Sequence, residues 1–384
     1  METLNKVSYY KFVIAIGIGS LFGVISANAS PFQIGLLIDE LGFTQQSTGA
    51  LVTIELFSVA LTSIIISPFM SRLSIRKVAI IGAVVAIGGQ IASVFIVQYV
   101  PLVAVRVVAA CGLGLTYAAA NAAGAKSENP DRVFSFAITF SLVLLAFFLV
   151  GLSKIIAVAG YQGLYISLAV LLVLVMPALA WLNIVSADLK NETHRSELPL
   201  QQLGLLLLVV ILFNLGTGAA WTFMERAGVQ LGLQAERIGF LIGLSTFAGI
   251  AGAISVSWLN GRLGRTLPLV GGLIVGGISS YLIAAGPSVT LFTIGVVTYW
   301  ASYMFMYPYL IGLACRLDDS GRSSAAVAGT LMLSFAMGPL LAAYISSVYS
   351  FEVLAVFCLA VCLAAALIVI PLTLPLDREN WDQK

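Results

Sequence analysis

The sequence predicts an all-α membrane protein with twelve transmembrane helices, arranged as two six-helix bundles, with both termini cytoplasmic. Of its 384 residues, 60% are hydrophobic and only 9% are charged, and the mean hydropathy is +1.04. Soluble domains carry about 25% charged residues. Runs such as GLLLLVVILF (204–213) are apolar on every side, which favours helices over the alternating strands of a membrane barrel. The net charge of +2 gives no indication of nucleic-acid binding.

Short polar breaks separate the apolar runs and define the predicted spans. Each run is long enough to cross a bilayer core of about 30 Å. In chain order, the spans cover 10–37, 48–69, 78–97, 101–124, 133–152, 162–184, 200–224, 237–258, 267–285, 288–314, 323–347 and 351–374.

The distribution of Lys and Arg tests this count independently. With a cytoplasmic N-terminus, fifteen of these residues fall on inner connections, three fall on or near outer ones, and Arg106 lies within the membrane. Cytoplasmic connections carry the excess of positive charge in membrane proteins. The first span, with Lys6, Lys11 and the ANA triplet at 27–29, also resembles a cleavable signal peptide. We prefer a retained span because it has a counterpart in the second half of the chain.

The chain aligns with itself at a shift of 190 residues. LGFTQQSTGAL (41–51) falls on LGLQAERIGFL (231–241), and the segment from Tyr117 falls on the segment from Tyr307. Such a repeat indicates two halves of six spans, and an even number of spans gives both halves the same orientation. The predicted domains are an N-terminal bundle over 1–185, a cytoplasmic linker over 186–199 and a C-terminal bundle over 200–384.

Short basic loops follow the second and eighth predicted helices, as SPFMSRLSIRK (67–77) and SWLNGRLGR (257–265). Together with the six-plus-six plan, these loops make the chain similar, over its whole length, to the major facilitator superfamily of secondary transporters. The family's loop pattern is Gly-x-x-x-Asp-Arg-x-Gly-Arg-Arg/Lys. Here most basic positions match, although Ile75 replaces one of them, and Ser71 and Gly261 stand at the two acidic positions. The resemblance implies that these loops take part in gating. Their matching residues are Arg72, Arg76, Lys77, Arg262 and Arg265.

Two charges inside the first half have no counterpart in the second. At the 190-residue shift, Glu55 corresponds to Ser245 and Arg106 to Val296. An ionised group at the centre of a lone helix costs about 2.5–3.5 kcal/mol, so each should face the protein interior beside a partner. Glu55 and Arg106 lie at similar depths, about 9 and 8 Å from the outer helix ends at 1.5 Å per residue. The two charges are therefore predicted partners, either as a static neutral pair or as a pair that binds substrate or exchanges protons.

The resemblance implies a central cavity lined by the first, fourth, seventh and tenth helices. Polar and aromatic residues on these helices are therefore candidate substrate or coupling contacts. They are Asn28, Gln33, Tyr117, Asn121, Asn214, Thr217, Trp221, Glu225, Trp300, Tyr303 and Tyr307. Packing is the alternative for the aromatic residues, and a solvated helix end is the alternative for Glu225 and Arg226. Adjacent helical residues point about 100° apart, so Glu225 and Arg226 are predicted not to face one site.

These observations predict a secondary active transporter that moves a small organic solute by alternating access, coupled to protons. A lipid or amphiphile flippase, and a membrane sensor that binds its ligand without moving it, stay open as alternatives. The single histidine, His194, lies in the linker, and no nucleophile or metal-ligand pattern occurs in the sequence. We therefore expect neither an enzyme nor a cofactor. The expected location is the plasma membrane, in a bacterium the inner membrane, and the expected state is a monomer whose partners are substrate, protons and lipid.

Overall fold

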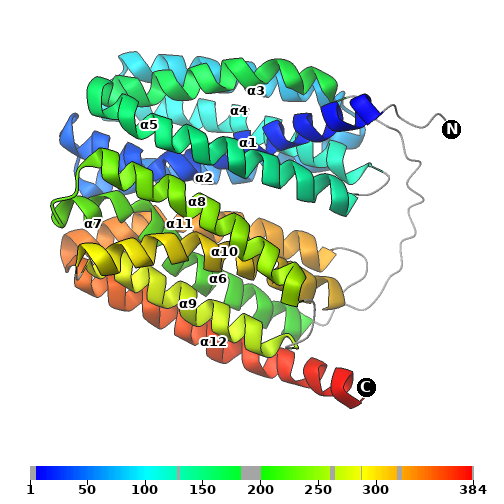
Figure 1. Cartoon of the computed structure of the whole chain (residues 1–384). Coiled ribbons are helices and arrows are strands. Elements are labelled where there is room, and N and C mark those ends of the chain that lie inside the picture. Colours follow the sequence, from blue (N-terminus) through cyan, green and yellow to red (C-terminus); the bar gives the residue numbers. More distant parts are fainter. Residues whose placement is uncertain are drawn as a thin grey trace. The chain divides into compact units, whose positions relative to one another are not determined.

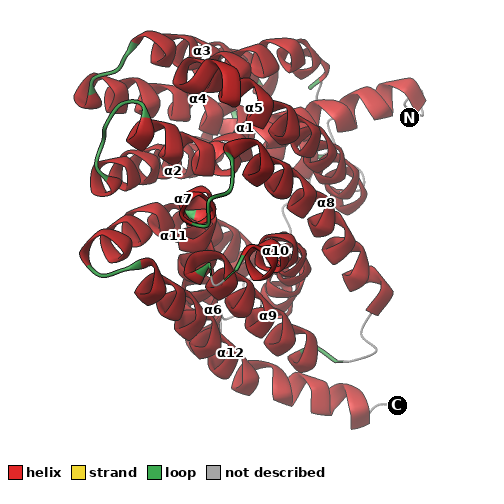
Figure 2. Ribbon diagram, turned by 60° about the vertical axis from the view of Figure 1, so that its left-hand side comes forward, coloured by secondary structure: helices red, strands yellow, loops and turns green. Residues whose placement is uncertain are grey.

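The computed structural model describes residues 6–127, 130–182, 200–259, 264–286, 288–317 and 322–382. Within these ranges every regular element is a helix (Figures 1 and 2), which confirms the predicted all-α class. The linker predicted over 186–199 lies outside the described residues, as does Arg262 of the second basic loop.

The helices follow one another with short connections. In the first half they are α1 (Lys6–Asp39), α2 (Gln45–Ile66), the 3-10 helix η1 (Ser67–Ser71), α3 (Ile75–Phe95), α4 (Tyr99–Ala125), α5 (Pro130–Val175) and η2 (Met176–Trp181). In the second half they are α6 (Leu200–Thr222), α7 (Met224–Gln230), α8 (Ala235–Leu259), α9 (Thr266–Ala285), α10 (Val289–Leu317), α11 (Arg322–Val348) and α12 (Phe351–Asp382).

Eleven helical segments of the described chain are long and apolar enough to cross a membrane. One of them, Arg132–Trp181, has 50 residues, and at 1.5 Å per residue its length of about 75 Å is more than twice what a bilayer needs. Gly160 interrupts this segment with φ 50° and ψ −137°, a backbone conformation that glycine alone adopts easily. The segment therefore accounts for two predicted spans, 133–152 and 162–184, and α6 corresponds to the seventh.

The helix boundaries follow the repeat found in the sequence. At the 190-residue shift, the start of α2 at Gln45 falls on the start of α8 at Ala235, and the starts of α4 and α10 coincide in the same way. Gly42 and Gly232, just before α2 and α8, have φ of 67° and 76°. This left-handed conformation favours glycine where a helix ends and the chain turns. The repeated glycine therefore serves the same turn in both halves.

The chain forms two compact units. The first comprises Met1–Phe43 and Ile54–Asn191, and the second comprises Thr44–Thr53 and Glu192–Lys384. In the first unit, α3 packs on α4 and α5, and α1 packs on α4 and α5. In the second unit, α12 packs on α6 and α9, α11 on α6, and α10 on α8 and α9.

Small residues bring α3 and α4 of the first unit close together. A Cβ added at Gly82 would lie 2.7 Å from the carbonyl oxygen of Gly112, and one at Gly89 would lie 2.9 Å from the Cα of Ala109. Close backbone approach through small residues is a common way for membrane helices to associate. These contacts fix the backbone of α4 in the two turns that follow Arg106.

Candidate functional site

A buried ion pair lies in the first unit. Glu55 on α2 and Arg106 on α4 are each 1% exposed. The Nε atom of Arg106 donates to Oε2 of Glu55 at 2.9 Å, and Nη2 donates to Oε1. These two parallel hydrogen bonds form a bidentate pair, which fixes the orientation of both side chains in addition to the attraction between their charges. The structure thus brings together the two membrane charges whose depths match in the sequence.

Three other helices of this unit surround the pair. Gln33 on α1 donates from Nε2 to Oε2 of Glu55 at 3.0 Å, and Gln90 on α3 accepts at Oε1 from Nη1 of Arg106 at 2.7 Å. The ring centroid of Tyr165, on α5 beyond Gly160, lies 4.9 Å from the guanidinium carbon of Arg106, which allows a cation–π contact. Helices α1 to α5 therefore each contribute one side chain to a single buried network, which consists of Gln33, Glu55, Gln90, Arg106 and Tyr165.

Several buried polar atoms in and near this network have no hydrogen-bond partner among the described residues. They include Nε2 of Gln90, the hydroxyl of Tyr165 and Oδ1 of Asn28, although Nδ2 of Asn28 donates to the carbonyl of Val24 at 2.8 Å. A buried donor or acceptor without a partner costs about 1–3 kcal/mol. Such atoms are usually satisfied by water or a polar ligand, so the interior of the first unit has the chemistry to receive a polar solute.

An aromatic cluster lies between α6 and α10 in the second unit. Trp221 on α6 stacks on Tyr299 of α10 with ring centroids 5.5 Å apart, and Trp300 meets Trp221 edge-on at 5.3 Å. Tyr303 stacks on Tyr299 at 6.3 Å and on Phe213 of α6 at 5.7 Å. Offset and edge-on rings at these separations attract one another beyond the burial of their surface. The rings therefore stabilise one another's positions.

Hydrogen bonds tie the same cluster to α6. The hydroxyl of Tyr303 donates to Oδ1 of Asn214 at 2.9 Å, and that of Tyr299 donates to the carbonyl of Thr217 at 2.9 Å. Nε1 of Trp300 is buried and has no partner within the described parts of the chain. The expected residues Asn214, Thr217, Trp221, Trp300 and Tyr303 thus lie together.

Glu225 and Arg226 also pair, and the prediction that they do not face one site is wrong. Nε of Arg226 donates to Oε2 of Glu225 at 2.7 Å, and Nη2 donates to Oε1 at 2.9 Å. The two residues are 6% and 9% exposed, so they are not a solvated helix end either. Phe223, with φ −99° and ψ 7°, separates α6 from α7. The pair lies in the first turn of a new helix, and the long arginine side chain bends back over its neighbour.

Three other expected residues lie apart from these clusters. Tyr117 is eleven residues beyond Arg106 on α4, about 16 Å at 1.5 Å per residue, and its ring packs against Gly23 of α1. Asn121 donates from Nδ2 to the carbonyl of Tyr117 at 3.0 Å. Tyr307, four residues beyond Tyr303 on α10, is 39% exposed. Helical spacing alone therefore overestimates how far each site extends along its helix.

The basic loops differ between the units. The residues of the first loop are exposed: Arg72, Arg76 and Lys77. In the second loop, Nη1 of Arg265 donates to the carbonyl of Gly312 on α10 at 3.0 Å. Asp377, on α12 beyond the candidate span Phe351–Pro375, accepts from the backbone N–H of Arg265 at 2.7 Å and of Thr266 at 2.9 Å. The acid that this loop lacks in sequence is therefore supplied by the last helix.

The charge of Asp377 is stabilised where it lies. Burial raises the pKa of this carboxyl, but the hydrogen bonds from Thr266 and Arg265 and the charge of Arg265 outweigh it, and the pKa falls below its ordinary value. A carboxylate at the first turn of a helix also interacts favourably with the helix dipole. Asp377 thus caps α9.

Sequence reasoning missed several members of these clusters, and two of them left a signal. Gln90 is the one amide within a predicted span that is otherwise apolar except for Ser93, the same kind of signal that singled out Glu55. Tyr299 lies four residues before Tyr303, so the two residues share a helix face. Tyr165 carries no such signal, because its role depends on which helix packs against α4.

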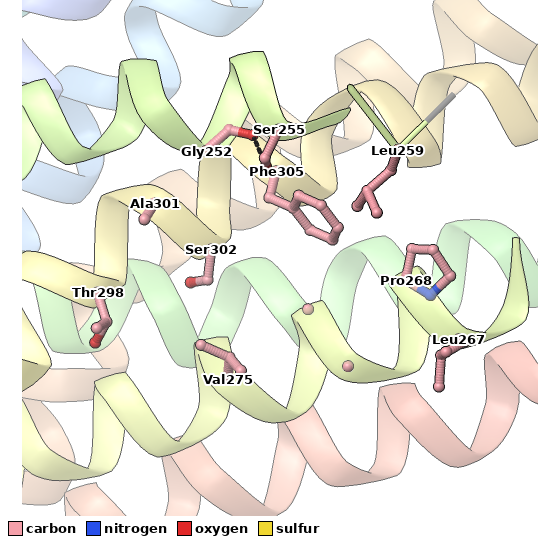
Figure 3. Close-up of a pocket in the computed structure, with 12 residues that line it drawn as sticks. Gly252, Ser255, Leu259, Leu267, Pro268, Val275, Thr298, Ala301, Ser302 and Phe305 are labelled. Atoms are coloured by element: carbon pink, nitrogen blue, oxygen red, sulfur yellow. Dashed lines mark hydrogen bonds between the residues drawn. The ribbon is translucent and has the colours of Figure 1, made fainter. Parts of the chain in front are cut away.

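A separate cavity of about 380 Å³ lies between α8, α9 and α10 (Figure 3). Its lining is mostly apolar and includes Leu259, Pro268, Val275 and Phe305. The glycines at 271 and 272 line it on the α9 side. None of the expected site residues is among its lining residues, so this cavity is distinct from the aromatic cluster.

Comparisons with known proteins agree on one architecture. The family model described as Major Facilitator Superfamily matches residues 14–314 and 206–384. A crystal structure of a mutant of the nucleoside transporter NupG is similar with a TM-score of 0.73 at 12% identity, covering 95% of this chain and 99% of that one. A crystal structure of a D-xylose-proton symporter gives a TM-score of 0.74 at 14% identity, covering 94% and 97%. No curated protein sequence matches the chain.

Proposed function

Because the chain belongs to the Major Facilitator Superfamily, we propose that it is a secondary active transporter of a small organic solute. It works by alternating access in the plasma membrane, as a monomer with cytoplasmic termini, and couples transport to protons at Glu55. The observation that carries this proposal is the buried network around Glu55 and Arg106.

The network links a proton to a substrate through the shared partner Arg106. While Glu55 is ionised, Arg106 is held by two hydrogen bonds. A proton on Glu55 removes the negative charge and frees the guanidinium for a polar or anionic group of the substrate. Leaving one charge of a buried pair without compensation costs about 3–5 kcal/mol. This cost makes proton binding and substrate binding depend on each other, which is what coupling requires.

The substrate is a polar solute that contains a ring. The aromatic cluster of the second unit gathers buried ring faces beside the amide of Asn214, and ring faces with a few polar groups are typical of small-molecule sites. The two similar structures are named as transporters of nucleosides and of D-xylose. Both kinds of compound are polar and contain a ring. They are the first compounds to test.

The test uses purified protein in vesicles with an imposed pH gradient. We expect Glu55→Gln to exchange labelled for unlabelled substrate but to lose accumulation driven by the gradient, since the amide keeps the shape and cannot ionise. The matched control is Glu236→Gln, on the exposed first turn of α8, which should accumulate substrate as the parent does. Parental accumulation by Glu55→Gln with unchanged pH dependence would remove Glu55 from coupling.

An amphiphile is the second candidate substrate, favoured by the apolar cavity between α8, α9 and α10. A fluorescent lysophospholipid in the same vesicles tests this candidate. Its movement between leaflets, without counterflow of nucleosides or D-xylose, would favour a flippase. Binding of a solute without any counterflow would favour a sensor.

A further inference from the structure

The break in α5 is held by a carboxylate from another helix. At Gly160 the chain leaves one helical segment, and the next begins at Tyr161. The backbone N–H of Tyr161 donates to Oε2 of Glu40 at 2.9 Å. A Cβ at position 160 would overlap the carboxylate of Glu40, so glycine is required by the contact as well as by its positive φ.

Glu40 is poorly placed for its own helix and well placed for α5. It follows the C-terminal end of α1, where a negative charge opposes the helix dipole, whereas at the first turn of the second α5 segment the same charge is favourable. The N–H groups at a helix start have no partner within the helix. The carboxylate therefore stabilises the helical segment that begins at Tyr161.

That segment carries the two tyrosines nearest the buried pair. The hydroxyl of Tyr161 donates to the carbonyl oxygens of Ser93 and Ile96, each at 2.8 Å, where α3 ends. One turn later, Tyr165 meets Tyr161 edge-on, with ring centroids 5.0 Å apart, and lies over the guanidinium of Arg106. A chain of direct contacts thus runs from exposed Glu40 to buried Arg106.

We propose that Glu40 is a positioning residue for the Glu55–Arg106 pair, acting through Tyr161 and Tyr165. The positioning role itself does not depend on the proposed function. Only its consequence for proton coupling rests on that function. The contacts themselves predict that loss of the Glu40 cap frays the first turn of the segment, lifts Tyr165 from Arg106 and lets the pair open more often.

The surroundings of Glu55 leave few other groups that can produce this response. The charged or titratable side chains that face it are Arg106 from α4 and Tyr165 from α5, while Gln33 from α1 and Gln90 from α3 are uncharged. Tyr161 interacts electrostatically with the guanidinium of Arg106. Of these, only the two tyrosines belong to the segment that Glu40 caps.

The test measures how readily Glu55 reacts with dicyclohexylcarbodiimide, an apolar reagent that adds to protonated carboxyl groups. Labelling of the Glu55 peptide is followed by mass spectrometry in purified protein at several pH values, and Glu55→Gln identifies the signal. We expect Glu40→Ala to raise the labelling rate about fivefold, the factor by which an ordinary helix cap shifts a local opening equilibrium. Glu40→Gln, which keeps one acceptor oxygen, should lie between Glu40→Ala and the parent.

The second unit offers a matched control. At the 190-residue shift Gly160 corresponds to Ser350, whose Oγ accepts from the backbone N–H of Val353 at 3.2 Å at the start of α12. Ser350→Ala removes a cap of the same kind and should leave Glu55 labelling unchanged. Parental labelling in both Glu40→Ala and Ser350→Ala would reduce Glu40 to a structural cap and overturn the proposal.

Two further variants keep the test decisive if Glu40→Ala does not fold. Tyr165→Leu removes the ring over Arg106 and should raise Glu55 labelling as Glu40→Ala does, and Glu40→Gln should still raise it above the parent. Parental rates in either variant would contradict the proposal. The assay needs neither substrate nor gradient, so a failure of proton coupling at Glu55 and a failure of this positioning role give different results.

Discussion

The two units of the chain bury charge in opposite ways. In the first unit, Glu55 and Arg106 are 51 residues apart, and five helices contribute to the network around them. In the second unit, Glu225 and Arg226 are neighbours in sequence and form their ion pair within a single helical turn. The geometry of the first pair therefore depends on how several helices pack, whereas the two members of the second pair share one short helix.

The features that repeat between the two units therefore have a different origin from the features that occur in one unit only. The glycine turns at 42 and 232 and the starts of α2 and α8 repeat, because each unit needs them to form its bundle. The buried network of the first unit and the aromatic cluster of the second do not repeat. Features that architecture does not require are the better candidates for coupling and substrate binding.

Orientation is the largest effect that the comparison predicts. Six spans in each half give both halves the same direction through the membrane, so a reporter fused after Glu197 should be cytoplasmic and one at Gly286 external. The readout is all or none: alkaline phosphatase activity at one position and green fluorescence at the other. The same side for both positions would show that the span count is wrong.

Removing the arginine should cost more stability in the first pair than in the second. Arg106→Ala leaves the carboxylate of Glu55 buried without compensation, at a cost of about 3–5 kcal/mol. Arg226→Ala should cost less, about 1–2 kcal/mol, because Glu225 lies in the first turn of α7 and gains from the helix dipole. Thermal unfolding in detergent measures both. The double variant Glu55→Ala with Arg106→Ala should recover much of the loss, and equal midpoints for the two single variants would remove the distinction between the pairs.

The fold was largely predictable from the sequence, and the sites were predictable only in part. Apolar runs and loop charges predict the spans because the bilayer permits few other structures. Glu55 and Arg106 were found because charged groups in an apolar span are expensive, whereas Gln33 was expected as a cavity contact from the family resemblance. Tyr165 could not be found in this way, since it contacts Arg106 only through the packing of α5 on its neighbours. The Glu225–Arg226 pair was missed because the angle between adjacent residues ignores the length of the arginine side chain.

The aromatic cluster can be tested against the other face of α10. Tyr303 belongs to the cluster, whereas Phe305 lines the apolar cavity on the α8 and α9 side (Figure 3). If the cluster binds substrate, Tyr303→Ala should weaken ligand affinity more than Phe305→Ala by about 0.5–1.5 kcal/mol, the contribution of one aromatic contact. Titration of purified protein with nucleosides and D-xylose measures this. Tyr303→Phe removes only the hydroxyl that donates to Asn214. Equal losses for Tyr303→Ala and Phe305→Ala would show that the cluster serves packing and does not bind substrate.

The smallest effect concerns Asp377, the acid that caps α9. Its pKa is lowered in the folded protein, so its contribution to stability is present above the pKa of the unfolded chain and is lost as pH falls through the folded value. Asp377→Asn should therefore destabilise the protein at neutral pH and have little effect in acid, where the parent carboxyl is protonated. Asp377 is partly exposed, so the loss should stay below about 1 kcal/mol. Unfolding midpoints at both pH values measure it, with Glu352→Gln on the exposed first turn of α12 as the control. A loss that is the same in acid as at neutral pH would show that the hydrogen bonds, and not the charge, hold the start of α9.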